Sequence, residues 1–223
     1  MTMITKNSVR DQAYEVIKSE IIHGKLPAGT RIVEENMGLQ YGISRTPLRE
    51  ALHRLESDGF LSRLPLRGLV VSEVSLREIN ELYEVRCYIE GLATRLATLR
   101  MSHIDRCYLT GLRDKGEESL NNKDIAAARN ELLVIHRFIH DKCDQRVCVE
   151  FLDKMQGRID RYKYLSVKAP GRAETTVYEH MEIIRLMVDG KAEQAEMAMR
   201  RHLQGANESC RYFFDASAQV AVE

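Results

Sequence analysis

Three histidines in the C-terminal half lie on apolar helical stripes, where side chains normally enter a protein core. His136 shares its stripe with Leu132 and Ile139, and His180 and His202 lie on similar stripes. A buried neutral imidazole must still satisfy two ring nitrogens, so three inward histidines are unfavourable unless they share a partner. The residues leave two alternatives open: three separate structural histidines, or one shared metal site, for which zinc or nickel suits imidazole.

Two arginines, Arg45 and Arg49, lie one helical turn apart near the start of a predicted helix in the N-terminal half. They occupy the face opposite an apolar stripe, which consists of Leu48, Ala51, Leu52 and Leu55. A helix N-terminus that carries arginines suits phosphates, and arginine makes bidentate contacts with guanine edges. Residues 10–73 contain as many acidic as basic side chains, so an ordinary solvated helix surface is the alternative.

The elements around these arginines are short and separated by tight turns, because proline and glycine are concentrated before residue 70. Hydrophobic spacing and turn residues predict helices over residues 9–23, 34–41 and 44–58 and strands over residues 60–64 and 69–73. Three short helices followed by a β-hairpin describe a winged helix-turn-helix, in which the second helix of the turn motif enters the DNA major groove.

The rest of the chain has the pattern of long helices with few breaks, and Pro170 is its only proline. The predicted helices cover roughly residues 75–99, 103–120, 124–142, 146–166, 173–189 and 191–214. We therefore predict a mainly α protein, with an N-terminal winged helix-turn-helix and small β-hairpin over residues 8–74. An antiparallel six-helix bundle follows over residues 75–215, and such bundles build ligand and metal sites in their interior.

The composition of the 223 residues is that of a globular protein, with 33 basic and 33 acidic side chains and 44% hydrophobic residues. The formal net charge of zero means that binding to DNA must depend on a local patch. Apolar runs are far shorter than the roughly 20 residues that cross a bilayer, so we predict a cytoplasmic protein without a membrane partner. The five cysteines contain no Cys-x-x-Cys pair, and we expect them to be reduced.

The N-terminal motifs closely resemble the DNA-binding domain of the GntR family of bacterial transcription regulators. The matching segments are residues 26–30 (LPAGT), 42–52 (GISRTPLREAL), 55–60 (LESDGF) and 67–68 (RG). The resemblance implies operator contacts from the recognition helix and a hairpin tip that reaches the minor groove. The residues that it assigns to DNA binding are Ser44, Arg45, Thr46, Arg49, Arg67 and Gly68. Some relatives have an arginine where this chain has Glu35, so the operator sequence cannot be transferred.

The C-terminal motifs are similar to the FCD effector domain of the FadR subfamily. The matching residues are Glu84–Arg86, Glu90, Ile135–His136, Glu179–Met181, Gly190 and Arg200–Leu203. Many such domains bind a divalent metal through one aspartate and three histidines and respond to small carboxylates or sugar acids. The resemblance thus assigns His136, His180 and His202 to the metal.

One ligand of the family is missing, because Leu132 occupies the position of the aspartate. Three alternatives follow: a metal with an extra open position, a further donor such as His140, or a weak or empty site. Arg86 lies at helical spacing from apolar residues and is expected to point inward, where it either pairs with Glu90 or anchors an effector carboxylate.

Taken together, these residues predict a homodimeric DNA-binding repressor, not an enzyme, that recognises a near-palindromic double-stranded operator. A small organic-acid effector held near the metal and Arg86 would control its affinity for DNA. Two other functions stay open at this point: a metal-dependent hydrolase-like enzyme, and a structural helical bundle without a ligand.

Overall fold

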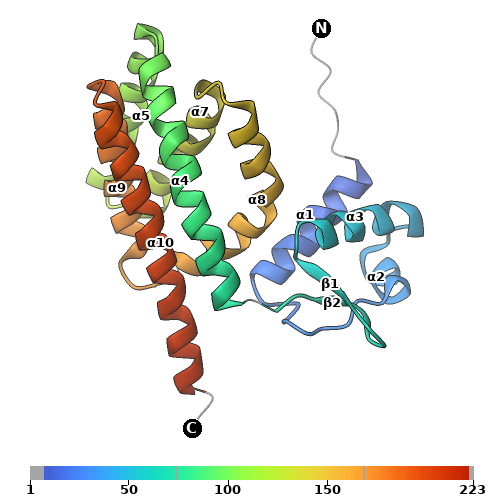
Figure 1. Ribbon diagram of the computed structural model, residues 1–223. Helices are drawn as coiled ribbons and strands as arrows, with labels where there is room; N and C mark the ends of the chain where they lie inside the picture. The colour runs from blue at the N-terminus through green and yellow to red at the C-terminus, as the bar shows by residue number, and fades with distance from the viewer. Residues whose placement is uncertain (1–7, 74, 168, 221–223) are drawn as a thin grey trace, which may run out of the picture. The chain divides into compact units, whose positions relative to one another are not determined.

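The computed structural model describes residues 8–73, 75–167 and 169–220 (Figure 1). Contacts divide the chain into two compact units, Met1–Ser75 with Lys154–Arg161 and Leu76–Asp153 with Tyr162–Glu223. Over the described ranges, every helix is too short or too polar to cross a lipid bilayer.

The N-terminal unit contains the three short helices and the hairpin that the sequence predicts. Its elements are α1 (Val9–Ile22), α2 (Glu34–Tyr41), α3 (Arg45–Ser57), β1 (Leu61–Leu64) and β2 (Gly68–Val71). Gly42 ends α2 with φ of 64°, a left-handed conformation that glycine adopts at little cost, and the chain then turns into α3. Ser44 is the N-cap residue of α3, but its hydroxyl accepts no capping hydrogen bond. A cap accepts from the second or third helical N–H, and Pro47 at the third position has none.

The hairpin pairs β1 with β2 antiparallel, from Leu61 opposite Val71 to Leu64 opposite Gly68. A short extended segment adds to the other edge of β2. There the Ile32 N–H donates to the Leu69 carbonyl over 2.8 Å, and Arg31 forms a bridge with Val70. The base of the hairpin is therefore fixed by backbone hydrogen bonds on both sides of β2.

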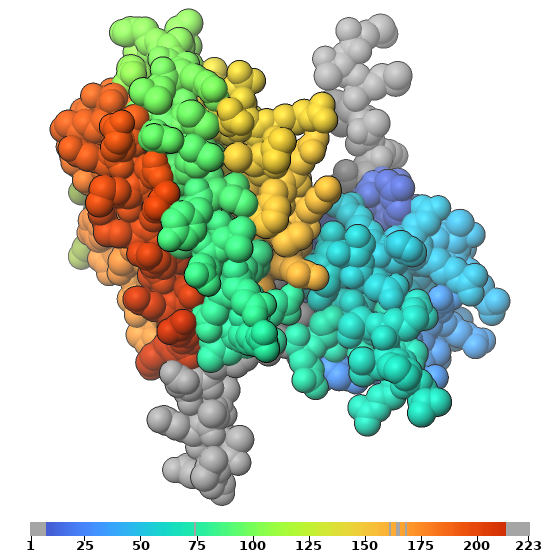
Figure 2. Space-filling model, in the orientation of Figure 1, coloured from blue at the N-terminus to red at the C-terminus, as the bar shows by residue number. Residues whose placement is uncertain are grey.

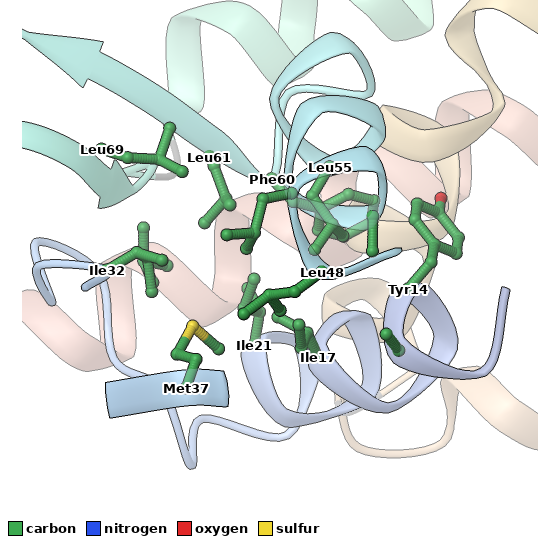
Figure 3. Packing of buried hydrophobic residues seen from close by; sticks show 14 residues of the cluster. Tyr14, Ile17, Ile21, Ile32, Met37, Leu48, Leu55, Phe60, Leu61 and Leu69 are labelled. Carbon is green, nitrogen blue, oxygen red and sulfur yellow. The ribbon is translucent and has the colours of Figure 1, made fainter. Parts of the chain in front are cut away.

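Helices α1 and α3 and the hairpin enclose the core of the N-terminal unit, where the side chains point toward one another (Figure 3). Ile17, Leu48, Leu55 and Phe60 are completely buried. Burial of each such side chain contributes about 1.5–3 kcal/mol to folding. This core fixes the inner face of α3 and leaves its outer face exposed.

The C-terminal unit is helical. Its elements are α4 (Leu76–Arg100), α5 (His103–Asn121), α6 (Ile125–Leu132), α7 (Val134–Lys142), α9 (Arg172–Val188), α10 (Ala192–Val220) and the two ends of α8 (Arg146–Ser166), whose residues 154–161 belong to the N-terminal unit. Helices α4 and α10 run side by side in opposite directions (Figure 1), and they cover one face of this unit (Figure 2).

The single helix predicted over residues 124–142 is instead two, α6 and α7, which meet at Leu133. The break changes the neighbours of the chain, because α6 packs on α5 and α9 whereas α7 packs on α4. Leu132, at the end of α6, is completely buried against Gly116 of α5. A periodic sequence cannot reveal such a break, since Leu133 keeps a right-handed helical conformation with φ of −60° and ψ of −25°.

A capping box starts α5. The Ser102 side chain accepts from the Asp105 N–H, and the Asp105 carboxylate accepts from the Ser102 N–H over 2.9 Å. Lys142 of α7 pairs with the same carboxylate over 2.7 Å. Hydrogen bonds from Lys142 and Ser102 lower the pKa of Asp105 to about 2. Asp105 thus ties the start of α5 to the end of α7.

Candidate DNA-binding face and metal centre

The recognition helix α3 has the two faces that its sequence predicts. The residues that it buries are Leu48, Ala51, Leu52 and Leu55. Ser44, Arg45, Thr46 and Arg49 are exposed, as is Arg67 at the hairpin, while Gly68 is half-buried. The side chains of these arginines therefore reach the solvent.

A hollow of about 340 Å³ lies between the start of α3 and the hairpin. Its lining residues are Arg31, Ile32, Val33, Glu34, Glu35, Arg45, Arg49 and Gly68. Three of the predicted DNA-binding residues, Arg45, Arg49 and Gly68, thus come together, whereas Ser44, Thr46 and Arg67 do not line the hollow. Sequence reasoning missed Arg31 and Glu34, because only the fold brings the segment before α2 and the first residue of α2 to the recognition helix.

Arg49 is held by a carboxylate that the sequence analysis did not connect with it. Its Nε lies 2.6 Å from Oε2 of Glu34 in α2; the Arg49 side chain is largely exposed and the Glu34 side chain is partly exposed. An exposed ion pair contributes only about 0–1 kcal/mol, so a DNA phosphate can replace Glu34 at modest cost. In the absence of DNA, Glu34 orients the guanidinium group of Arg49.

The three predicted metal-binding histidines converge from three helices, His136 from α7, His180 from α9 and His202 from α10. One ring nitrogen of each lies within 4.8 Å of those of the other two. The Nε2 atoms of His136 and His180 are 3.3 Å apart. His180 is completely buried and His202 nearly so. The three rings therefore form one cluster that could hold a metal ion, rather than lying apart in the core.

Two carboxylates outside this cluster hold two of the rings. Oε2 of Glu90 lies 2.6 Å from Nδ1 of His136, and Oε2 of Glu179 lies 2.7 Å from Nδ1 of His202. Burial alone would raise the pKa of Glu90, but Arg86 and then His136 outweigh it and hold this pKa well below its usual value. The pKa of Glu179 is also lowered, because hydrogen bonds from His202 and Arg172 outweigh its burial. Both carboxylates are ionised acceptors, so each Nδ1 donates.

Donation from Nδ1 leaves Nε2 of His136 and His202 as the nitrogen with a free lone pair, provided that the rings are neutral. Burial ensures this, since it lowers the pKa of all three histidines, that of His202 to about 4. Carboxylates that bind the far nitrogen of a histidine are the usual outer partners of a metal site. The donor set therefore fits a divalent metal.

The fourth ligand of the family is not replaced by any of the described residues within the cluster. Leu132 has no donor atom and packs on Gly116. Nε2 of His140 is buried without a hydrogen-bond partner, and it lies 3.9 Å from Oε2 of Glu90 rather than among the three ligand nitrogens. Among the described residues, the cluster thus offers three nitrogen donors, and His140 is not one of them.

Arg86 is buried and paired, with its Nε 2.7 Å from Oε1 of Glu90. The salt bridge that the sequence left as one alternative is therefore formed. A second buried arginine was missed. Nη1 of Arg172 lies 2.8 Å from Oε1 of Glu179, and its Nη2 donates to the His202 carbonyl over 2.9 Å. The seven-residue spacing of Arg172 and Glu179, two helical turns, was the available signal.

Comparison with known proteins agrees with both halves of the site. Residues 9–71 match the family described as "Bacterial regulatory proteins, gntR family", and residues 81–205, more than half of the chain, match the FCD domain. The FCD match is consistent with the predicted FadR subfamily and implies a small-molecule effector.

Individual relatives cover nearly the whole chain. The HTH-type transcriptional repressor RspR of Escherichia coli (strain K12) is 25% identical over 210 residues, 91% of this chain and 89% of the relative. The HTH-type transcriptional regulator YdhC of Bacillus subtilis (strain 168) is 27% identical over 205 residues, 90% of this chain and 89% of the relative. The solved structure of E. coli McbR/YncC shares the fold, with a TM-score of 0.70, 22% identity and coverage of 94% of this chain and 99% of that chain.

These proteins are transcription regulators rather than enzymes, as the sequence predicts for this chain, which argues against the hydrolase alternative. The winged helix-turn-helix and the helical domain occur in the family order. The chain therefore belongs to the GntR family of bacterial DNA-binding transcription regulators, with an FCD domain after its winged helix-turn-helix.

Proposed function

We propose that a small carboxylate or sugar-acid effector, bound at the histidine cluster, controls the affinity of this regulator for its operator. The observation that carries the proposal is the charge of the donor set. The clustered side chains of His136, His180 and His202 are neutral donors, and Leu132 stands where the family resemblance implies an aspartate. A divalent ion in this site would keep its full charge and an open coordination position, which favours an anionic ligand.

Zinc or nickel is the ion that we propose, since both bind imidazole nitrogens. When bound, the ion would attract an effector carboxylate. Glu90 and Glu179 orient the rings of His136 and His202. Arg86 would bind a further effector carboxylate, which then shares the guanidinium with Glu90.

Regulation requires that the effector bind one arrangement of the protein more tightly than another. We propose a homodimer whose two recognition helices bind a near-palindromic operator, and a repressor that the effector releases. On this scheme Ser44, Arg45, Thr46, Arg49 and the Arg67–Gly68 tip contact DNA. Such a protein acts in the cytoplasm, where the bacterial chromosome lies.

The metal and the effector are tested together. Protein purified with and without chelator is analysed for zinc and nickel, and thermal shifts are recorded with a set of carboxylic and sugar acids. We expect bound metal, and an acid that raises the melting temperature only in the metal-loaded protein. A protein that never holds metal, or an acid that stabilises the chelated protein equally, would contradict the proposal.

The DNA-binding face is tested separately. Arg49→Ala should weaken binding to an operator selected from a pool of random duplexes, without a change in metal content. Arg77→Ala, which removes an exposed arginine of α4, is the control. Equal affinity of the Arg49→Ala protein and the wild type would show that α3 does not present this face to DNA.

A further inference from the structure

We propose that Arg31 is an additional DNA-binding residue, which contacts a backbone phosphate between the recognition helix and the hairpin. Arg31 lies in the segment before α2, outside the motifs that identify the recognition helix and the hairpin tip. The fold nevertheless brings it to the hollow that Arg45 and Arg49 line.

The backbone of this segment is fixed in an extended conformation beside β2. The Gly29 N–H donates to the Val71 carbonyl, and the Val71 N–H donates to the Thr30 carbonyl, each over 2.9 Å. With the Ile32 hydrogen bond to Leu69, three backbone bonds hold the segment on the edge of the hairpin. A side chain in this segment therefore has a defined direction.

That direction is outward for Arg31. Ile32 is 7% exposed and points into the core beside Met37 and Leu69 (Figure 3). Successive side chains of an extended segment point to opposite sides, so Arg31 points away from the core. Arg31 is exposed accordingly, and it lines the hollow together with Gly68.

The pairing of charges sets Arg31 apart from other arginines of this unit. Arg10, Arg54 and Arg63 each have a carboxylate partner within 4.0 Å. By contrast, no carboxylate of the described residues forms an ion pair with Arg31 or Arg45. Two guanidinium groups without an acidic partner thus lie beside the start of α3. An anionic ligand could bind them without displacing a carboxylate from an ion pair.

The two acidic residues of the hollow do not cancel this charge. Glu34 is engaged by Arg49, and Glu35 remains as the one lining carboxylate outside an ion pair among the described residues. A duplex phosphate would meet Arg31 and Arg45 together. Phosphate contacts fix the position of a protein on the duplex but carry no sequence information, so Arg31 should act on affinity for any duplex.

The experiment compares full-length variants on a fluorescein-labelled duplex of mixed sequence, by anisotropy over a range of salt concentrations. Loss of one phosphate contact makes the slope of log K against log salt shallower by about 0.9. We expect this change for Arg31→Ala, with affinity about tenfold weaker at low salt, and near-normal binding for Arg31→Lys, which keeps the charge. Lys25→Ala, with the same loss of charge at an exposed position outside the hollow, should leave the slope unchanged.

Arg45→Ala serves as the comparison within the hollow. If Arg45→Ala weakens binding to the duplex and Arg31→Ala does not, the assignment of Arg31 is wrong and that of Arg45 stands. If neither variant differs from wild type, both Arg31 and the proposed face are wrong. Thermal melting checks that Arg31→Ala keeps its fold, and a slope equal to that of wild type in a folded variant refutes the contact.

Discussion

Replacement of His180 by leucine should separate the metal site from the stability of the fold. His180 is completely buried, and its Nδ1 has no hydrogen-bond partner among the described residues. Leucine is of comparable size and has no polar atom to satisfy. We therefore expect His180→Leu to lose metal while it raises the stability of the metal-free protein.

The two effects on stability are of similar magnitude but have different causes. Removal of an unsatisfied buried polar atom stabilises the folded state by about 1–3 kcal/mol. Metal at a concentration 100 times its dissociation constant stabilises the wild type by about 2.7 kcal/mol. Since 1 kcal/mol shifts the melting temperature by roughly 2–4 °C at this size, a chelator should lower that of the wild type by about 5–10 °C.

The assay is differential scanning fluorimetry with zinc, with nickel and with EDTA, together with metal analysis of the purified protein. His180→Leu should show the same melting temperature in all three conditions, above that of the chelated wild type. His103→Leu, which changes an exposed histidine of α5, should behave as wild type. A His180→Leu protein that keeps its metal, or a wild type that melts at the same temperature with and without EDTA, would refute the reasoning.

Other predictions concern single contacts. Glu34→Gln removes the carboxylate that holds Arg49, so it should strengthen binding to a mixed-sequence duplex and steepen the salt dependence, as measured by anisotropy. The pKa of Asp105 is about 2, below its unfolded value of about 3.9, so its stabilising effect is complete above that value and is lost as the pH falls toward 2. Urea unfolding should accordingly show that Asp105→Asn is less stable than wild type at pH 7 and that this difference shrinks as the pH falls through about 2. Gly116→Ala would place a Cβ 2.9 Å from Cδ1 of Leu132 and should lower the free energy of unfolding in urea by about 1–3 kcal/mol. In the double variant with Leu132→Ala, the smaller side chain should relieve part of this clash. The loss of stability should therefore be smaller than the sum of the two single losses.

The N-terminal fold was predictable because its signals are local. Spacing of apolar residues, Gly42 and the turn at residues 65–68 each act within a few positions of the element that they define. The bounds of α2 and the buried stripe of α3 agree with prediction for this reason. The break at Leu133 was missed because both halves keep a helical pattern and only their packing partners differ.

The inward position of the three clustered histidines was predictable as well, since each lies on an apolar stripe. Their outer carboxylates were not. Glu179 precedes His180 in sequence but holds His202, and Glu90 holds His136 from a position 46 residues away. Contacts of this kind join different helices, and helical spacing contains no information about which helices become neighbours.

Local patterning of apolar, turn and charged residues thus determined the class of fold, the exposed arginines of α3 and the three inward imidazoles. Tertiary structure alone decided that these imidazoles meet, that Glu90 and Glu179 fix which ring nitrogen is free, and that Arg31 reaches the recognition helix. The physical reason is the short range, along the chain, over which a sequence pattern carries information. Periodicity reports which side of its own element a residue occupies, whereas a site depends on the packing of several elements against one another.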